Sequence, residues 1–212
     1  MDKVSKGWIY GFIGVAIFSA SLPATRIAVA DFAPLFLTNA RAAIAGLLAL
    51  GLLIVLPQPR PDKSDLKSLL IVAIGVVVGF PLLTALALQH ITSAHSIVFI
   101  GLLPLTTAIF GVLRGDDNPR PLFWLFSIVG GILVAGYALT QDHTANWTGD
   151  LLMFAAIIVC GWGYAEGGKL SRKLGGWQVI SWALVLSLPL MAPLTFFTMP
   201  ENFVGVSLNA DK

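Results

Sequence analysis

The stretch that decides the fold is SLLIVAIGVVVGFPLLTALALQH, residues 68–90, which contains no Asp, Glu, Lys or Arg. A bilayer core about 30 Å thick is crossed by about twenty residues of apolar helix. Six other stretches of the chain are apolar over a similar length. The sequence therefore predicts an all-α polytopic membrane protein of about seven transmembrane helices, at 7–29, 33–56, 68–90, 94–113, 121–140, 149–169 and 175–198.

The composition agrees with a membrane protein. Of 212 residues, 57% are hydrophobic and 11% are charged, whereas a soluble domain carries about 25% charged residues. The net charge is only +2, and no basic cluster is interleaved with aromatics, which argues against nucleic acid as a partner. Cys160 is the single cysteine, so we predict no internal disulfide, no metal site and no cofactor. The few acidic residues lie mostly at helix ends, so we do not expect an enzyme.

The links between the apolar stretches alternate between cation-rich and cation-free. Under the positive-inside rule, the cation-rich links are cytoplasmic. The N-terminus is then cytoplasmic and the C-terminus outside, in a multi-pass protein of the cell membrane that we place in a bacterial inner membrane. This orientation is the reverse of that of heptahelical receptors. Ten of the thirteen Lys and Arg residues fall on the cytoplasmic side: Lys3, Lys6, Arg60, Lys63, Lys67, Arg114, Arg120, Lys169, Arg172 and Lys173.

Helix ends carry recognisable signals. Pro34 and Pro121 suit the first turn of a helix, where the missing N–H has no partner to lose. The predicted N-caps are Ser64 or Asp65, Ser93 and Thr148. Aromatic residues near predicted ends match the interfacial belt of membrane proteins; they are Trp8, Trp124, Tyr137, Trp147 and Trp177.

The apolar layout repeats within the chain. When the sequence is shifted by 142 residues, the span pair 7–56 overlays 149–198 without a gap. The first unit has five spans and starts inside, so the second starts outside, which is the pattern of inverted-repeat transporters. We therefore divide the chain into a complete five-helix repeat at 1–142, two helices of an inverted second repeat at 143–200, and a polar tail at 201–212.

Short motifs occur in a definite order along the spans: Trp8 with Pro23-Ala24-Thr25, Asn39-Ala40-Arg41-Ala42-Ala43-Ile44-Ala45, Thr92-Ser93-Ala94 with Leu103-Pro104-Leu105, Gly130-Gly131 with Gly136, and Gly149-Asp150-Leu151-Leu152 with Trp162. In order and spacing they resemble the EamA-type members of the drug/metabolite transporter superfamily, which carry two five-helix repeats. The resemblance implies export of small metabolites, such as amino acids or their derivatives. The chain departs from the family at 114–118, where an acidic residue is usual, and in lacking the last three helices. We therefore expect a second repeat that is cut short.

Arg41 is the main candidate for a functional residue, because a charge deep in a bilayer is costly unless it meets water or a partner. One interpretation places it in an aqueous cavity, where it holds a substrate carboxylate or phosphate. The other has it bonding backbone carbonyls freed near the proline-broken first span. Prolines inside spans often mark transporter binding sites, and Pro23, Pro81, Pro104 and Pro189 are expected to interrupt spans. The predicted substrate-binding residues are Ser19, Ser21, Pro23, Arg41, Pro104, Trp162 and Tyr164.

Glu166 also has two interpretations. It is a candidate for proton coupling, or it pairs with Lys169 one turn later as an interfacial ion pair. Small residues four apart, as in Gly7 with Gly11 and Gly163 with Gly167, predict close helix contacts.

Two functions from different classes remain open. The first is a secondary transporter that works by alternating access on a small metabolite. The alternative is a truncated, non-transporting membrane fragment or an assembly partner of another membrane chain. The missing helices predict an exposed apolar face, and with it a homodimer or pairing with another membrane chain. The lipid bilayer is expected to surround the protein in either case.

Overall fold

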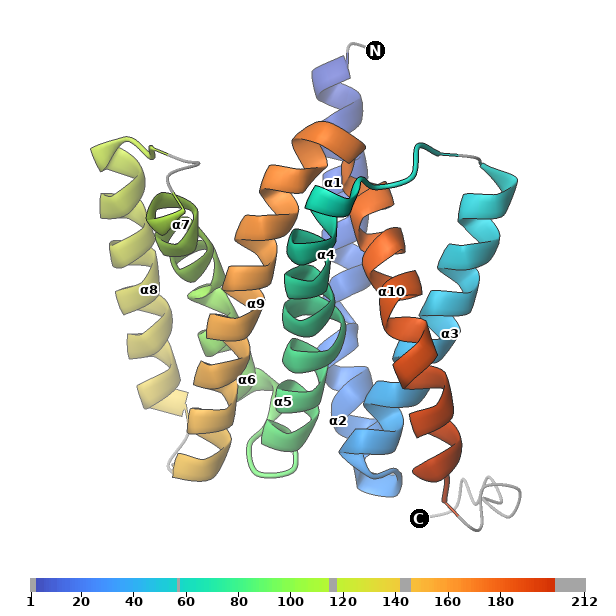
Figure 1. The fold of residues 1–212 in the computed structure, drawn as a ribbon. Coiled ribbons are helices and arrows are strands. Elements are labelled where there is room, and N and C mark those ends of the chain that lie inside the picture. Colours follow the sequence, from blue (N-terminus) through green and yellow to red (C-terminus); the bar gives the residue numbers. More distant parts are fainter. Residues whose placement is uncertain (1–2, 57, 115–117, 142–145, 201–212) are drawn as a thin grey trace.

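The computed structural model describes residues 3–56, 58–114, 118–141 and 146–200, and every regular element in them is a helix (Figure 1). The elements are α1 (Lys3–Ser19), α2 (Ser21–Asp31), α3 (Pro34–Val55), η1 (Lys63–Asp65), α4 (Leu66–Val72), η2 (Ala73–Gly79), α5 (Phe80–Ala87), α6 (Ser93–Gly101), α7 (Leu103–Leu113), α8 (Pro121–Gln141), α9 (Trp147–Leu174) and α10 (Gly176–Phe197).

The helices match the predicted spans. Six of the described segments are long and apolar enough to cross a bilayer, and the apolar helix Pro121–Leu133 at the start of α8 is shorter. The six are Gly7–Asp31, Pro34–Val55, Lys63–Ala87, Ser93–Leu113, Trp147–Leu174 and Gly176–Phe197. The prediction of an all-α polytopic membrane protein is therefore confirmed.

Three of the four prolines expected to interrupt spans lie in the first turn of a helix. Pro23 is the third residue of α2, and Pro81 and Pro104 are the second residues of α5 and α7. N–H groups at such positions have no partner within an isolated helix. The first and fourth spans are divided just before these prolines, between α1 and α2 and between α6 and α7. The third span continues through Pro81, because the N–H of Phe80 donates to the carbonyl of Gly75 in η2. Pro189 lies inside α10, which also continues through it. Breaks at Pro81 and Pro189 were wrong predictions, since a membrane helix tolerates a proline whose freed carbonyl finds another donor.

The third span contains a π-helical segment, η2, between α4 and α5. In an α-helix the ring of Pro81 would clash with the carbonyl of Val77. Val77 lies in the π-helical segment, whose wider turn makes room for the ring. On the same segment, a Cβ atom on Gly75 would lie 2.7 Å from the carbonyl oxygen of Val159 and 3.0 Å from Cα of Gly163. The backbones of η2 and α9 therefore nearly touch, as small residues in membrane helices allow.

The N-caps differ from those predicted by one to three residues. Asp62 forms a capping box with Asp65 before η1. Thr92 caps α6, its hydroxyl accepting from the N–H of His95 at 3.1 Å. Asn146 caps α9 by accepting from the N–H of Thr148 and of Gly149. In each case the capping side chain precedes the helix, where it reaches the free N–H groups of the first turn.

Helix α9 packs against α4, η2, α5, α6, α7 and α10, and it lies among them in Figure 1. Met153, Ala156, Ile157 and Cys160 of α9 are fully buried. Near the start of α9, Asp150 Oδ1 lies 2.8 Å from Nε2 of His95 on α6. This helix is thus the central element of the described bundle.

Helices α3 and α10 occupy equivalent places in the predicted repeat and pack against each other. Shifted by 142 residues, the bounds of α3 coincide with those of α10. The two helices run in opposite directions (Figure 1). At their contact, a Cβ atom on Gly46 would lie 3.0 Å from Cδ1 of Leu188, which is the residue equivalent to Gly46 under the shift.

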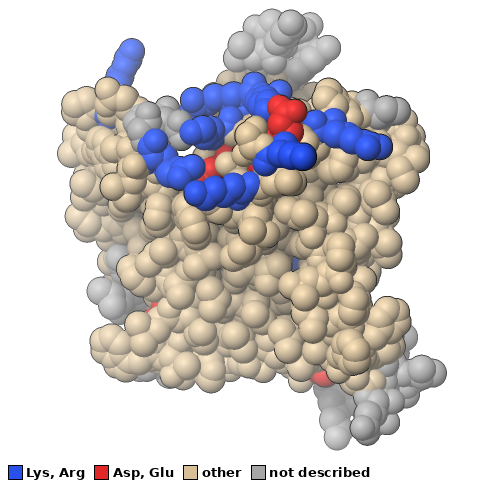
Figure 2. Space-filling view, viewed as in Figure 1, with Lys and Arg blue, Asp and Glu red and all other residues tan. Residues whose placement is uncertain are grey.

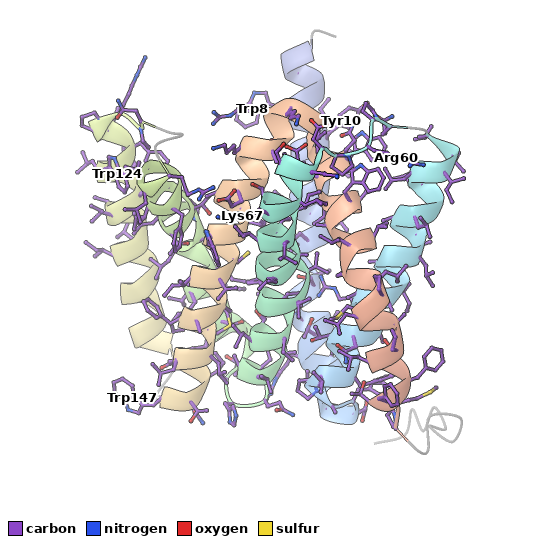
Figure 3. The ribbon with its side chains drawn as sticks, in the orientation of Figure 1. Trp8, Tyr10, Arg60, Lys67, Trp124 and Trp147 are labelled. Atoms are coloured by element: carbon purple, nitrogen blue, oxygen red, sulfur yellow. The ribbon has the colours of Figure 1, made fainter. Side chains whose placement is uncertain are left out.

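Cations gather at one end of the bundle (Figure 2). The links at this end follow α3, α7 and α9, and α1 starts there (Figure 1). Figure 3 shows Trp8 and Trp124 toward the same end and Trp147 at the opposite end, as expected of an aromatic belt. The structure does not describe the side chains of Lys3, Lys6 and Tyr137.

Among the six candidate spans, the first is the least covered. Its most apolar window is only 11% buried, against 50% for the window of Lys63–Ala87. Trp8, Phe12 and Ile17 are each more than 70% exposed. Helix α1 therefore presents apolar side chains at the surface of the described bundle.

Candidate functional site

A cavity of about 580 Å³ opens between α2, α3 and α5, and we call it the Arg41 cavity. The side of α2 that lines it carries only short side chains at a spacing of three or four residues, which leaves the space open. Its lining residues are Ser21, Ala24, Thr25, Ala28, Leu37, Thr38, Ala40, Arg41, Ile44, Ala45, Leu48, Pro81 and Ala85.

Arg41 is the only charged residue of this lining, and it makes no hydrogen bond or ion pair with any residue that the structure describes. It starts the third turn of α3, about 10 Å of helix rise from Pro34. The expectation that Arg41 bonds freed backbone carbonyls is therefore not met. That role belongs to Arg26, whose guanidinium donates to the carbonyl of Leu88 at the end of α5. Arg41 itself lines the cavity, which agrees with the first of its two interpretations.

Thr38 lies one turn before Arg41 on the same side of α3. Its side chain lines the cavity, yet the residue is only 3% exposed. Its hydroxyl oxygen has no hydrogen-bond partner among the described residues. The other two hydroxyls of the lining belong to half-buried residues, Ser21 and Thr25. That of Thr25 donates to the carbonyl of Ser21 at 2.7 Å. The cavity thus combines a cation without a protein partner with one fully buried hydroxyl that has none.

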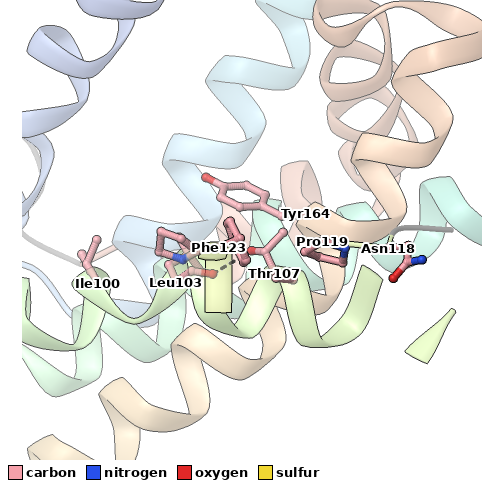
Figure 4. A pocket seen from close by; sticks show the side chains of 9 residues that line it. Ile100, Leu103, Thr107, Asn118, Pro119, Phe123 and Tyr164 are labelled. Atoms are coloured by element: carbon pink, nitrogen blue, oxygen red, sulfur yellow. Dashed lines mark hydrogen bonds between the residues drawn. The ribbon is translucent and has the colours of Figure 1, made fainter. Parts of the chain in front are cut away.

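A second cavity of about 750 Å³ lies between α6, α7, α8 and α9, and we call it the Tyr164 cavity (Figure 4). Its lining is mostly apolar, and the hydroxyl of Thr107 is used within α7, where it donates to the carbonyl of Leu103 at 2.8 Å. The lining residues are Ile100, Leu103, Pro104, Thr107, Ala108, Asn118, Pro119, Phe123 and Tyr164. Its described lining residues offer an aromatic and aliphatic surface without a charged group.

Glu166 is buried, with a side chain that is 0% exposed. Its Oε1 lies 2.6 Å from Nη2 of Arg114, the residue that ends α7. Its Oε2 accepts a hydrogen bond of 2.9 Å from the hydroxyl of Ser68 on α4. The interpretation of Glu166 as an interfacial ion pair on the surface of one helix is therefore wrong, because its partners come from two other spans.

The structure separates the predicted substrate-binding residues into groups. Ser21 and Arg41 line the Arg41 cavity, while Pro104 and Tyr164 line the Tyr164 cavity. The other three line neither cavity: Ser19 is exposed and donates to the carbonyl of Ala16 at 2.7 Å, and Pro23 and Trp162 are exposed.

Sequence reasoning missed Thr38 and Ser68. The signal for Thr38 was its position three residues before Arg41, on one side of the same helix. Ser68 carried no comparable signal, because its partner Glu166 is far away in the sequence.

The fold and the buried charges define a membrane protein with a polar cavity, and comparison with known proteins defines its class. Residues 5–139 match the EamA-like transporter family. The chain therefore belongs to this family of membrane transporters, within the drug/metabolite transporter superfamily. No solved structure gives a significant match.

Individual relatives agree with the family. The chain is 67% identical over 210 residues to the "Uncharacterized transporter YdeK" of Bacillus subtilis, a match that covers 99% of this chain and 73% of the relative. It is 28% identical over 177 residues to the "S-adenosylmethionine/S-adenosylhomocysteine transporter" of Chlamydia trachomatis serovar L2, covering 76% of this chain and 52% of that protein. An "Uncharacterized transporter" of Archaeoglobus fulgidus is 25% identical over 153 residues, with 68% and 52% covered.

Proposed function

We propose that this protein is a secondary transporter that exports small metabolites, such as amino acids or their derivatives, by alternating access. The observation that carries the proposal is the relation between α3 and α10. Their bounds coincide after a shift of 142 residues, they run in opposite directions, and they pack on each other. Two oppositely oriented copies of one unit can exchange conformations, which opens a central site to each side of the membrane in turn.

The repeats in this proposal are residues 1–142 and 143–200. The contact of Gly46 with its own equivalent, Leu188, supports an axis of pseudo-symmetry between α3 and α10. A residue can contact its own equivalent in the other repeat only close to the axis that relates the two repeats. In the 212-residue chain, the second unit contributes α9 and α10.

The substrate class in this proposal follows from the family and from one relative. The two compounds named for the Chlamydia transporter are derivatives of amino acids. The Arg41 cavity is the proposed binding site, since its volume is within the range of small-molecule sites. The Tyr164 cavity, with Pro104, offers an apolar wall that is suited to an uncharged portion of a substrate.

Glu166 is the proposed site of proton coupling. Its carboxylate is buried between α4, α7 and α9, and its counter-charge Arg114 is 39% exposed at the helix end. If the end of α7 moves away from α9, the carboxylate loses its partner inside the membrane, and a proton is then the simplest way to neutralise it.

The proposed location is the bacterial inner membrane, with the N-terminus and the cation-rich end of the bundle in the cytoplasm. The gathering of Lys and Arg at one end supports this orientation.

Transport is tested by expressing the chain in a bacterial strain that has been loaded with amino acids by dipeptide feeding. Mass spectrometry of the medium should show faster release of at least one amino acid or derivative than in the same strain with an empty vector. Gly51→Ala serves as a matched control, because a Cβ at Gly51 meets nothing within 4 Å. If the strain that carries the protein in its membrane releases every measured amino acid and derivative at the rate of the empty-vector strain, the proposal is overturned.

A specific observation favours the alternative of an assembly partner, namely the poorly covered first span. On that alternative, the chain alone transports nothing and its α1 contacts a second membrane chain. Cysteine cross-linking from position 12, through Phe12→Cys in a Cys160→Ser background, would then capture a partner in membranes. Efflux by the chain alone contradicts this alternative.

A further inference from the structure

The feature of the described chain that most clearly indicates a ligand is the Arg41 cavity. An arginine inside a bilayer needs an opposite charge, water or several acceptors. Arg41 has no protein partner among the described residues, and none of the thirteen lining residues is an acid. Arg41 is itself exposed, so water or an anion that enters the cavity from outside these elements can neutralise it.

Thr38 gives a second and independent indication of a ligand. A hydroxyl that is buried without a hydrogen bond is destabilising, and buried polar groups are nearly always paired. The Thr38 hydroxyl is unpaired although the residue is 3% exposed, and it lines the same cavity as Arg41. A ligand acceptor in this position would satisfy the hydroxyl and the guanidinium together.

The donors favour a carboxylate over other anions. A guanidinium presents two parallel N–H groups that match two oxygens of a carboxylate or of a phosphate, so the charge decides between them. The guanidinium balances a single negative charge, and the neutral Thr38 hydroxyl adds one hydrogen bond, whereas a phosphate near neutral pH carries up to two charges and has three free oxygens. Apart from Ser21 and Thr25, the remaining lining is aliphatic, which suits a modest side chain.

The positive charge of Arg41 also disfavours ligands that are permanent cations. A ligand whose only charge is positive would face Arg41 with no acid in the lining to offset the repulsion. Organic cations, which include many hydrophobic drugs, are therefore poor ligands of this cavity.

We infer that the Arg41 cavity binds the carboxylate of the transported compound through Arg41 and Thr38, and that it rejects compounds whose only charge is positive. The inference rests on the proposed transport function, of which it specifies the substrate class. It makes no use of the Tyr164 cavity or of Glu166.

The test measures binding by the purified, full 212-residue chain in detergent, independently of transport. The probes are a panel of N-acetyl amino acids, the corresponding N-acetyl amino acid amides, and tetraphenylphosphonium. Isothermal titration should show at least one N-acetyl amino acid binding about ten- to a hundredfold more tightly than its amide, since a hydrogen bond to a charged group is lost in the amide. Tetraphenylphosphonium should not compete with it.

Three variants assign the preference to the site. Arg41→Gln should abolish the difference between acid and amide, and Arg41→Lys should keep only part of it, because lysine lacks the paired donors. Thr38→Val, which keeps the shape of the side chain, should weaken the acid about three- to tenfold. Arg120→Gln removes an exposed cation outside both cavities and should change nothing.

Folding of each variant is checked by its thermal unfolding, which should be unchanged for Arg41→Gln because Arg41 has no partner to lose. Equal affinity for acids and amides in the wild-type chain, or an acid preference that survives both Arg41→Gln and Thr38→Val, overturns the inference even if export occurs. Acid binding that depends on Arg41 in a chain that exports nothing overturns the transport proposal and leaves Arg41 and Thr38 as a carboxylate site of another function.

Discussion

Arg114 at the end of α7 lies with its Nη2 atom 2.6 Å from Oε1 of Glu166 on α9, and this pair joins two spans inside the bundle. The Glu166 side chain is completely buried, whereas Arg114 is 39% exposed. Arg114 also sits at the C-terminal end of its helix, where a positive charge is favoured by the helix dipole. The two residues therefore contribute unequally to stability.

Removing Arg114 should be more harmful than neutralising Glu166. Arg114→Ala leaves a buried carboxylate without its cation. We expect the free energy of unfolding to fall by about 2–3 kcal/mol, which is less than for a fully buried pair because Arg114 is partly exposed. Glu166→Gln keeps the hydrogen bond from Ser68 and should cost about half as much. Unfolding in detergent, followed by tryptophan fluorescence, measures both, with Arg120→Ala as the control. Equal effects of the two variants would show that the buried charge is neutralised by another group.

Gly75 should resist substitution. A Cβ atom there would lie 2.7 Å from a backbone oxygen and 3.0 Å from a backbone carbon of α9, and neither can rotate away. We expect Gly75→Ala to destabilise the protein by about 1–3 kcal/mol through forced separation of η2 and α9. Gly51→Ala, where a Cβ meets nothing within 4 Å, should be neutral or stabilising by up to about 1 kcal/mol. If the two variants unfold alike, the spans do not approach each other as described.

Lys173 should contribute a small stabilisation that depends on salt. Its Nζ lies 2.7 Å from Asp62 Oδ2 and 2.7 Å from Asp65 Oδ2, but the lysine side chain is 49% exposed. We expect Lys173→Ala to lower the free energy of unfolding by up to about 1 kcal/mol, and the loss to shrink as ionic strength rises. The effect of Arg114→Ala should change much less with salt, because Glu166 is shielded from it. Unfolding at 50 mM and at about 500 mM NaCl distinguishes the two pairs.

The orientation predicts the behaviour of reporter fusions. Alkaline phosphatase fused after Lys212 should be active and green fluorescent protein there should be dark, because the chain is proposed to end outside. Fusions after Gly115, in the cation-rich link between α7 and α8, should behave in the opposite way. A fluorescent fusion after Lys212, at normal membrane levels, would contradict the proposed orientation.

The spans were predictable because bilayer thickness fixes the length of an apolar helix, and only two residues separate α9 from the predicted start at 149. Their caps were less predictable. Asn146 was preferred over Thr148 because its side chain reaches two free N–H groups, which is a matter of local geometry. The predicted interruption of a span was correct at Pro104 and wrong at Pro189. Proline is tolerated both in the first turn of a helix and inside a membrane helix, so its presence alone does not distinguish the two.

Contacts between distant spans were the least predictable features. Glu166 has Lys169 as a near neighbour in the sequence, but its ion pair is with Arg114, which the sequence places in a loop. Likewise, Gly7 and Gly11 have the spacing of a helix contact, yet a Cβ on either meets nothing within 4 Å of the described chain. Arg41 and Ser21, both predicted as substrate-binding residues, line one cavity between α2, α3 and α5, but their role in binding stays a prediction.

The π-helical segment Ala73–Gly79 fixes the number of residues in the third span. Its wider turn holds about one residue more than an α-helix would over the same rise. Deleting a single residue from it would let the span become a continuous α-helix of nearly unchanged length, but everything beyond Gly79 would then be rotated by about 100°. Pro81 and Ala85, which now line the Arg41 cavity, would face a different neighbour, so the shape of that cavity depends on a surplus residue that the deletion would remove.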